Sequence, residues 1–132
     1  MIGYNAQAND RDSLQETRTM NHLASRECVP CRGGIPPLSE EAARPLLAQL
    51  DGWQVEEGHH LLKIYSLPDF AAALNLVNRF GAIAEKAGHH PDLLLSWGRV
   101  EARIWTHKID GLSESDFILA AKFDDVVGRS GR

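Results

Sequence analysis

The sequence predicts an α+β fold: a four-stranded antiparallel sheet with helices packed on one face, in the order α-β-β-α-β-β-α. Two pairs of short, partly alternating apolar segments each surround a glycine-containing turn, as β-hairpins do. Three segments with helical apolar spacing lie before, between and after these pairs. Single strands do not alternate with helices, so a parallel sheet is not indicated, and the helices are expected to gather on one face.

A first short helix is expected after Ser39, whose hydroxyl is a favourable N-cap, and before Gly52. Pro45 lacks the N–H that an interior helical residue donates, so the regular helix is expected to begin nearer Arg44. Three leucines supply the apolar stripe of this helix: Leu46, Leu47 and Leu50.

A hairpin and a long helix follow. Residues 53–56 and 61–66 read as two strands joined by a turn at Gly58. Asp69 is a favourable N-cap for the long helix, and Gly88 can end it in a left-handed conformation. Apolar residues at steps of three or four are expected to form its buried face: Phe70, Leu74, Val77, Phe80, Ile83 and Ala84.

The second hairpin and the last helix complete the predicted domain. Residues 93–97 and 100–107 flank Gly98, which permits the positive φ of a tight turn. The last helix, residues 113–127, opens with a capping-box pattern in which Asp116 stands three positions after the N-cap.

Composition and charge exclude several classes of protein. The chain has 132 residues, 43% of them hydrophobic, and a formal net charge of -4. A general nucleic-acid-binding protein would normally carry a basic patch or a high pI, so that class is not indicated. No apolar run approaches the roughly 20 residues of a membrane-spanning helix. Residues 1–27 lack a signal-peptide core and carry acidic residues that fit a transit peptide poorly, so a soluble, cytoplasmic protein is expected.

The chain divides into two parts. Residues 1–37 are polar or rich in Gly and Pro, and we expect a flexible extension with a loop that holds Cys28 and Cys31. Residues 38–128 contain the predicted helices and strands and form the domain. One CxxC pair is half of a structural zinc site, and the Gly and Pro after it do not start a thioredoxin-type helix. A loop with two thiols is therefore favoured over metal sharing between chains or redox sensing.

Three of the six histidines are expected to lie near one another. His89 and His90 follow the long helix, and the second hairpin returns His107 toward them. Because the unperturbed pKa of histidine, about 6.5, permits proton transfer near neutral pH, this group indicates acid and base chemistry. A zinc site with three histidine ligands is the alternative. It is less favoured, because adjacent histidines on extended backbone point apart.

Other polar and aromatic candidates have structural explanations. The remaining histidines are expected to be surface residues or satisfied core residues: His22, His59 and His60. For Asp116, a capping role is favoured over a catalytic one. Trp97 and Trp105 could stack on a planar ligand, but an aromatic residue on a strand more often belongs to a core.

The order and spacing of seven residues resemble the signature of the pterin-4a-carbinolamine dehydratases: Glu85, His89, His90, Pro91, Trp97, His107 and Asp116. The resemblance extends over roughly residues 38–127 and agrees with the predicted order of helices and strands. It implies an enzyme that dehydrates 4a-hydroxytetrahydropterin, the by-product of aromatic amino-acid hydroxylation, to quinonoid dihydropterin. Such an enzyme supports tetrahydropterin recycling.

The resemblance also implies roles for individual residues. His89 and His90 would share the acid and base roles, and His107 would bind or orient the hydroxyl group of the substrate. Glu85 would tune His89. Substrate-binding positions are implied along the same stretch: Glu85, Pro91, Trp97, Thr106, Lys108, Ile109 and Asp116. No metal and no organic cofactor is implied for this reaction.

The expected partners are a pterin substrate and further copies of the chain. A small sheet leaves edges exposed, and covering an edge is a reason for chains to pair, so a homodimer or homotetramer is expected. No nucleic-acid or membrane partner is expected. Mammalian members of the family also act as dimerisation partners of a transcription factor. The alternative function is therefore a non-catalytic dimerisation or transcriptional-cofactor module of the same fold, although the complete histidine set favours the enzyme.

Overall fold

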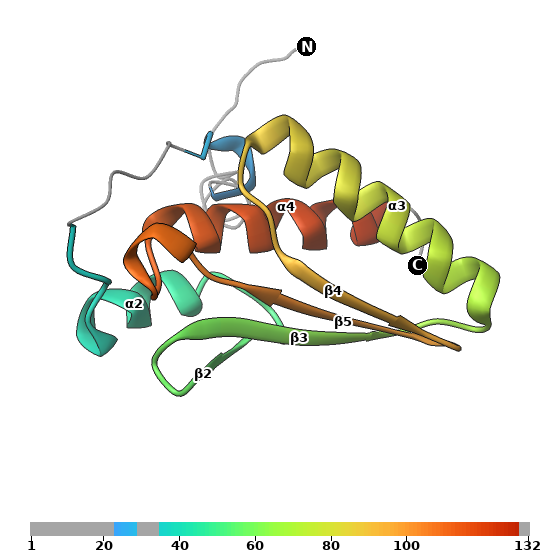
Figure 1. Ribbon diagram of the computed structural model, residues 1–132, viewed down its shortest axis with the longest axis horizontal. Helices are drawn as coiled ribbons and strands as arrows, with labels where there is room; N and C mark the ends of the chain where they lie inside the picture. The colour runs from blue at the N-terminus through green and yellow to red at the C-terminus, as the bar shows by residue number, and fades with distance from the viewer. Residues whose placement is uncertain (1–22, 29–34, 130–132) are drawn as a thin grey trace, which may run out of the picture.

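The computed structural model describes residues 23–28 and 35–129 of the chain. After a helical turn at residues 23–25, the elements follow in the order α2 (Glu40–Leu47), β2 (Gln54–Glu56), β3 (His60–Ser66), α3 (Phe70–Ala87), β4 (Asp92–Ser96), β5 (Arg99–Ile104), the 3-10 helix η1 (His107–Ile109) and α4 (Glu114–Arg129) (Figure 1). The order of α2 to α4 confirms the predicted fold class. No helix in the described residues is long and apolar enough to cross a membrane.

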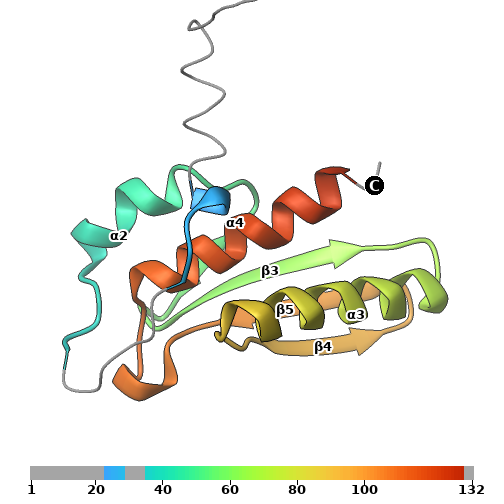
Figure 2. The ribbon, with the colours of Figure 1, turned by 90° about the horizontal axis from the view of Figure 1, so that it is seen from above.

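The strands form one antiparallel sheet in the order β2-β3-β5-β4. Helices α3 and α4 lie against the same face of this sheet (Figure 2), as predicted. Side chains alternate between the two faces of a strand. On β5 the row that faces the helices is fully buried: Val100, Ala102 and Ile104. On the opposite face of β5, the Glu101 carboxylate pairs with Arg99 and Arg103.

Helix α2 begins earlier than expected. The predicted start near Arg44 is wrong, because the helix starts at Glu40 and contains Pro45. The Ser39 hydroxyl accepts a hydrogen bond from the Ala42 N–H at 3.1 Å and so stabilises the first turn. The fixed φ of proline, about -65°, fits a helix, and its main cost is one lost backbone bond. Here the N-cap offsets part of that cost.

Helix α3 has the two ends that the sequence indicates. The Asp69 carboxylate accepts from the Ala72 N–H at 2.8 Å. At the other end Gly88 has a φ of 69°. The Gly88 N–H donates to the Glu85 carbonyl and the His89 N–H donates to the Ala84 carbonyl, each at 3.2 Å. These two bonds form a Schellman motif, which stops the helix and redirects the chain at the following histidines.

The buried face of α3 differs from the predicted one at its first turns. Phe70 and Leu74 are 44% and 42% exposed, so their predicted place in the core is wrong. Phe80 and Ala84 are buried as predicted, and Ala73 and Leu76 are the buried residues nearer the start of the helix. Helical spacing allows either of two adjacent rows of apolar residues to face the sheet. The packing of α3 against β4 and β5 buries the row that begins with Ala73 and leaves the row that begins with Phe70 exposed.

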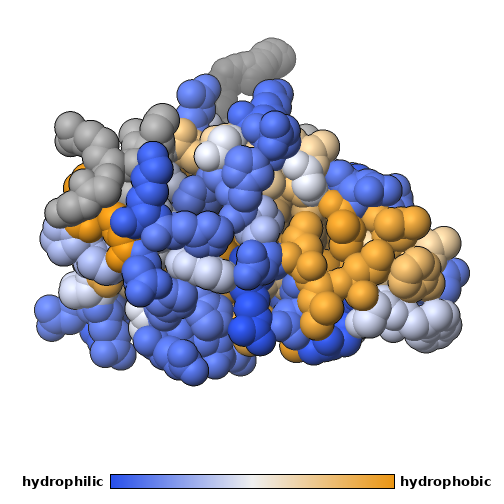
Figure 3. Space-filling view, viewed as in Figure 1, coloured by the Kyte–Doolittle hydropathy of each residue, from blue (hydrophilic) through white to orange (hydrophobic). Residues whose placement is uncertain are grey.

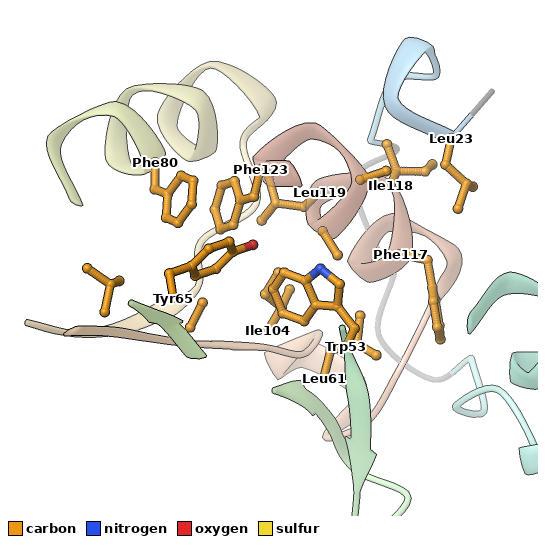
Figure 4. Packing of buried hydrophobic residues seen from close by; sticks show 14 of the residues in the cluster. Leu23, Trp53, Leu61, Tyr65, Phe80, Ile104, Phe117, Ile118, Leu119 and Phe123 are labelled. Atoms are coloured by element: carbon orange, nitrogen blue, oxygen red, sulfur yellow. The ribbon is translucent and has the colours of Figure 1, made fainter. Parts of the chain in front are cut away.

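The core lies between the sheet and helices α3 and α4 (Figure 4). Phe80 of α3 and Phe123 of α4 stack with ring centroids 4.1 Å apart. Tyr65 of β3 meets Phe80 edge-on, with centroids 5.1 Å apart, and Trp53 meets Tyr65 in the same way at 6.3 Å. These rings connect both helices with the first hairpin through apolar contact.

Asp124 of α4 adds a polar connection to the same hairpin. Its carboxylate accepts hydrogen bonds from Trp53 Nε1 at 3.0 Å, Lys63 Nζ at 2.9 Å and the Tyr65 hydroxyl at 2.8 Å. Burial and the nearby carboxylate raise the pKa of Tyr65, so its hydroxyl remains a donor. Because three donors satisfy the carboxylate, α4 is held to β3 and to the loop before β2.

Strand β5 ends earlier than predicted. The expected extension to residue 107 is wrong, because β5 ends at Ile104 and His107 begins η1. The Thr106 N–H donates to the Gly111 carbonyl at 2.8 Å and closes a turn in place of a strand ladder. Asp110 has a φ of 52° within this turn, a left-handed conformation that Asp tolerates better than most residues.

Gly111 lies against the segment that leads into α2. A Cβ atom at this position would lie 2.6 Å from the Cβ of Pro37. Beside this contact, the Leu38 N–H donates to the Leu112 carbonyl at 2.8 Å. The missing side chain at residue 111 therefore allows residues 37–38 to lie directly on the turn after β5.

The N-terminal helical turn packs on α4. Leu23 is 1% exposed and belongs to the core. Arg26 pairs with Glu114 at 2.6 Å, and Lys122 Nζ donates to the Ala24 carbonyl at 2.8 Å. This part of the predicted extension therefore contacts the domain.

Only one of the two cysteines lies in the described part of the chain. Burial raises the pKa of the Cys28 thiol, whose Sγ lies 3.6 Å from the Ser115 carbonyl oxygen. A raised pKa reduces the fraction of reactive thiolate. The predicted loop with Cys31 and the predicted flexible extension over residues 1–22 lie outside the described residues.

Replacing Gly111 with Ala should destabilise the protein, because the new Cβ and the Pro37 ring cannot occupy the same space. We expect the free energy of unfolding to fall by about 1–3 kcal/mol, measured by urea denaturation. Gly81→Ala is the matched control, because Gly81 lies inside α3 with open space around it and Ala favours a helix by up to about 1 kcal/mol. Equal stability of the two variants would contradict the close contact.

Candidate active site

Asp116 lies at the centre of the candidate site. Its side chain is 0% exposed, and both of its carboxylate oxygens accept hydrogen bonds. Oδ1 lies 2.5 Å from His89 Nε2, and Oδ2 accepts from the Thr106 hydroxyl and the Ser113 N–H, each at 2.8 Å. The Ser113 contact is the predicted capping-box bond. A buried carboxylate is tolerated where donors surround it, so these bonds hold three separate segments together.

His89 is directed inward by the end of α3. Its side chain is 12% exposed and lies against the Asp116 carboxylate. Because Nε2 donates to that carboxylate, the tautomer of a neutral ring is fixed and Nδ1 is the nitrogen left for proton transfer. A histidine oriented by a buried carboxylate is an arrangement that can act as an acid or a base.

His90 points to the other side of the chain. Its Nε2 lies 2.9 Å from Oε1 of Glu85, and the two side chains are 60% and 82% exposed. Glu85 thus contacts His90, and not His89, the residue that the resemblance implies it tunes. The helix cap explains the exchange: after Gly88 successive side chains point to opposite sides, so His90 returns to the last turn of α3.

His107 lies in η1 and packs on an aromatic neighbour. Its ring centroid is 4.5 Å from that of Trp105. Thr106, the residue between them, donates its hydroxyl hydrogen bond to Asp116. His107 is therefore the next residue in the chain after one of the three residues that bind the Asp116 carboxylate. The three candidate histidines thus have three different partners.

Two further histidines lie beside this site. His59 and His60 have ring centroids 5.2 Å and 5.9 Å from that of Trp105. The register of β3 and β5 accounts for these contacts. Leu61 pairs with Ile104, so the preceding and following residues, His60 and Trp105, are the next cross-strand neighbours.

The other predicted site residues fall into two places. Four of them lie next to the candidate histidines in the chain: Pro91, Thr106, Lys108 and Ile109. Trp97 instead lies in the turn after β4 and is 71% exposed. A strand rises about 3.3 Å per residue, so Trp97 is about 16 Å along β4 from the end that carries the histidines.

In residues 23–28 and 35–129, no group of three or more His, Cys, Asp and Glu side chains is arranged to hold a metal ion. Two surface hollows lie away from the candidate histidines. One is between α2 and the first hairpin, and the other is between the N-terminal segment and helices α3 and α4. The candidate residues lie around the ends of α3 and β5.

The family follows from comparison with known proteins. A model of the family described as pterin 4 alpha carbinolamine dehydratase matches residues 36–126. The chain belongs to this family. The matched residues include Asp116 and the three candidate histidines. Membership assigns the chain to the hydro-lyases.

Bacterial members of the family are about half identical to this chain. A protein of Rubrobacter xylanophilus is 52% identical over 105 residues, which are 80% of this chain and 98% of the relative. A protein of Alkaliphilus metalliredigens is 51% identical over 106 residues, which are 80% of this chain and 96% of the relative. Both have provisional names as pterin-4-alpha-carbinolamine dehydratases. Nearly the whole length of each relative therefore corresponds to part of this chain.

Solved structures share the fold of the family. A transcriptional coactivator/pterin dehydratase from Brucella melitensis has a TM-score of 0.64 and 30% identity, over 68% of this chain and 97% of that one. A pterin dehydratase-like RuBisCO assembly factor of the alpha-carboxysome has a TM-score of 0.51 and 19% identity, over 59% and 92%. At that identity the second likeness shows the fold alone.

Replacing Asp116 with Asn should weaken the fold, because the amide nitrogen would either face the donors Thr106 and Ser113 or force the His89 ring into the other tautomer, and the charged acceptor is lost. We expect the free energy of unfolding to fall by about 1–3 kcal/mol, measured by chemical denaturation. Asp51→Asn, in an exposed loop, should change it by less than about 0.5 kcal/mol. If the two variants were equally stable, Asp116 would not be what holds the three segments.

Proposed function

We propose that the protein dehydrates 4a-hydroxytetrahydropterin to quinonoid dihydropterin by histidine acid and base catalysis, and so supports tetrahydropterin recycling in the cytoplasm. Membership of the family supports the reaction. The observation that carries the catalytic proposal is the His89 ring, which the buried Asp116 carboxylate holds at 2.5 Å. Asp116 then acts through His89, as a positioning residue.

The reaction requires two proton transfers. The bond between C4a and its hydroxyl oxygen breaks, and the hydroxyl takes a proton from an acid and leaves as water. The proton on N5 passes to a base as the double bond between N5 and C4a forms. Nothing is oxidised or reduced, so two side chains that titrate near neutral pH can supply the catalysis.

His89 and His90 are the proposed acid and base. His89 presents Nδ1 in an orientation that Asp116 fixes. His90 is 60% exposed, which allows it to exchange its proton with solvent between turnovers, and Glu85 orients its ring. Holding both groups before the substrate arrives lowers the entropic cost of the transition state.

The turn that contains η1 is proposed to bind the pterin next to these two residues. His107 would orient the C4a hydroxyl, and the backbone at Thr106, Lys108 and Ile109 would meet the pterin ring. The Thr106 hydroxyl already donates to Asp116, which supports a backbone role for this residue. Pro91 would form the wall of the pocket after His90.

Purified protein should increase the rate of dehydration of 4a-hydroxytetrahydropterin above the rate in buffer, followed by the absorbance of the product. His89→Ala and His90→Ala should each lower kcat/KM by on the order of 100-fold, because each removes a proton-transfer group. Asn78→Ala, at an exposed position of α3, is the control and should keep the activity.

An unchanged rate in the presence of the protein would remove the proposed activity. A large loss in only one of the two histidine variants would assign both proton transfers to that residue. Treatment with a chelator should leave the rate unchanged if histidines alone move the protons.

A dimerisation or transcriptional-cofactor module is the second candidate function. The name of the Brucella melitensis structure, which combines a coactivator with a pterin dehydratase, favours it. The His89→Ala variant separates the two functions. An enzyme loses turnover in this variant, whereas a cofactor module keeps its binding to a protein partner, because the His89 side chain is only 12% exposed.

We also propose that two copies of the chain pair through β4. In the described residues β4 is bonded to β5 alone, and such an unpaired edge favours pairing with another strand. An apolar area covers α3 and β4 (Figure 3), and the exposed large apolar residues beside this edge are Phe70, Leu74, Leu94 and Trp97. Antiparallel pairing around a two-fold axis at Leu94 would bring Trp97 next to Pro91 of the partner subunit. Trp97 would then lie near a pterin site in the assembly.

Replacing Leu94 with Lys should convert the oligomer into a monomer, because two lysines would face each other across the two-fold axis. Light scattering after size-exclusion chromatography measures this change. Ile64→Lys is the matched control, since Ile64 is 48% exposed against 54% for Leu94, but lies on β3, away from the edge. Loss of the oligomer in both variants, or in neither, would exclude β4 as the interface.

A further inference from the structure

Trp105 lies between the first hairpin and the candidate site and has ring neighbours in both. It directly follows β5, while His60 begins β3 and His59 ends the turn before it. The ring centroids of His59, His60 and His107 lie 5.2, 5.9 and 4.5 Å from the centroid of Trp105. One indole ring therefore contacts both the hairpin and the histidine that is proposed to orient the substrate.

A chain of hydrogen bonds connects the same hairpin to the end of η1. His59 Nε2 lies 2.8 Å from Asp110 Oδ1, and His59 Nδ1 lies 3.1 Å from His60 Nδ1. Asp110 is the residue that ends η1. The turn that carries His107 is thus held at two points: at its start by the Trp105 ring, and at its end by His59.

The two hydrogen bonds can persist whether or not the histidine pair is protonated. The Asp110 carboxylate only accepts, so His59 donates through Nε2. Between the two Nδ1 atoms, His60 donates when both rings are neutral, and His59 donates when it carries the proton. The pKa of His60 is lowered by burial, by Arg103 and by His59, against the opposite effect of Glu57 and Glu56. When His59 carries the proton, both of its N–H groups have acceptors: Asp110 Oδ1 for Nε2 and His60 Nδ1 for Nδ1.

We propose that Trp105 and the pair of His59 and His60 are positioning residues for His107: they hold the turn of residues 107–110, and with it the His107 imidazole, in the orientation that the substrate requires. The kinetic part of this inference rests on the proposed dehydratase function. The structural part does not, because the orientation of His107 exists without substrate.

A purely structural role for these residues predicts a different outcome. Rings that only fill space at the end of the sheet would stabilise the fold, and their loss would not depend on His107. A positioning role requires the effect of His59 or Trp105 on catalysis to act through His107. The two roles therefore differ in the coupling between residues, which a double-mutant cycle measures.

The first measurement is the nuclear magnetic resonance spectrum of the His107 ring in the full-length protein. The Trp105 ring current displaces the His107 ring-proton resonances, and His107→Ala assigns them. In His59→Ala these resonances should move toward the positions of a free histidine. In Gln54→Ala, on β2 of the same hairpin, they should stay unchanged. Unchanged His107 resonances in His59→Ala would overturn the proposal.

The second measurement is a kinetic cycle with 4a-hydroxytetrahydropterin. His59→Ala should lower kcat/KM by on the order of tenfold, because a misplaced orienting group loses part of its effect. In the His107→Ala background the same substitution should change kcat/KM by less than about twofold. Trp105→Leu is the second probe and should show the same coupling.

The two measurements separate the possible failures. If the unsubstituted protein does not dehydrate the pterin, the proposed function fails, and the His107 resonances alone decide the positioning role. If it dehydrates the pterin but His59→Ala costs the same factor with and without His107, the positioning role fails and the enzyme remains. His59 is at a hairpin turn with its side chain 30% exposed, so its variant is expected to fold even if Trp105→Leu does not.

Discussion

The buried carboxylate of Asp116 is the constraint on which the rest of the site depends. A charge with 0% exposure is tolerated only if donors replace the lost water, and the donors come from three places in the chain: His89 after α3, Thr106 after β5 and Ser113 at the start of α4. None of these segments can move without leaving part of the carboxylate unpaired. The need to pair one buried charge thus fixes the relative positions of these three segments.

Local signals allowed much of the fold to be predicted. Asp69 and Gly88 define both ends of α3 because a capping carboxylate and a left-handed glycine act within one helical turn. The predictions were wrong where contacts between residues far apart in the chain determine the structure. Phe70 lies outside the core because sheet packing selects another stripe of α3, and β5 ends at Ile104 because Thr106 bonds to Gly111 instead of a strand.

The identity of the candidate residues was accessible from the sequence, but their partners were not. Spacing singled out His89 and Glu85, whereas the backbone turn at Gly88 decides that Glu85 meets His90. A single histidine near a hairpin turn carries no sequence signal of a functional role, so His59 is not recognisable from the sequence. Its contact with Trp105 exists only through the register of β3 and β5, which depends on residues far apart in the chain.

Helix α4 is fastened at two levels, by Asp116 in its first turn and by Asp124 two turns later. A rod fixed at one level can still roll about its axis, but a rod fixed at two levels cannot. If the proposed substrate binds here, movement on its entry is therefore expected at the exposed His90 ring and not in α4. For the design of new specificity, α4 is the part to leave unchanged. Substitutions that alter ligand preference are better placed around the exposed His90 ring.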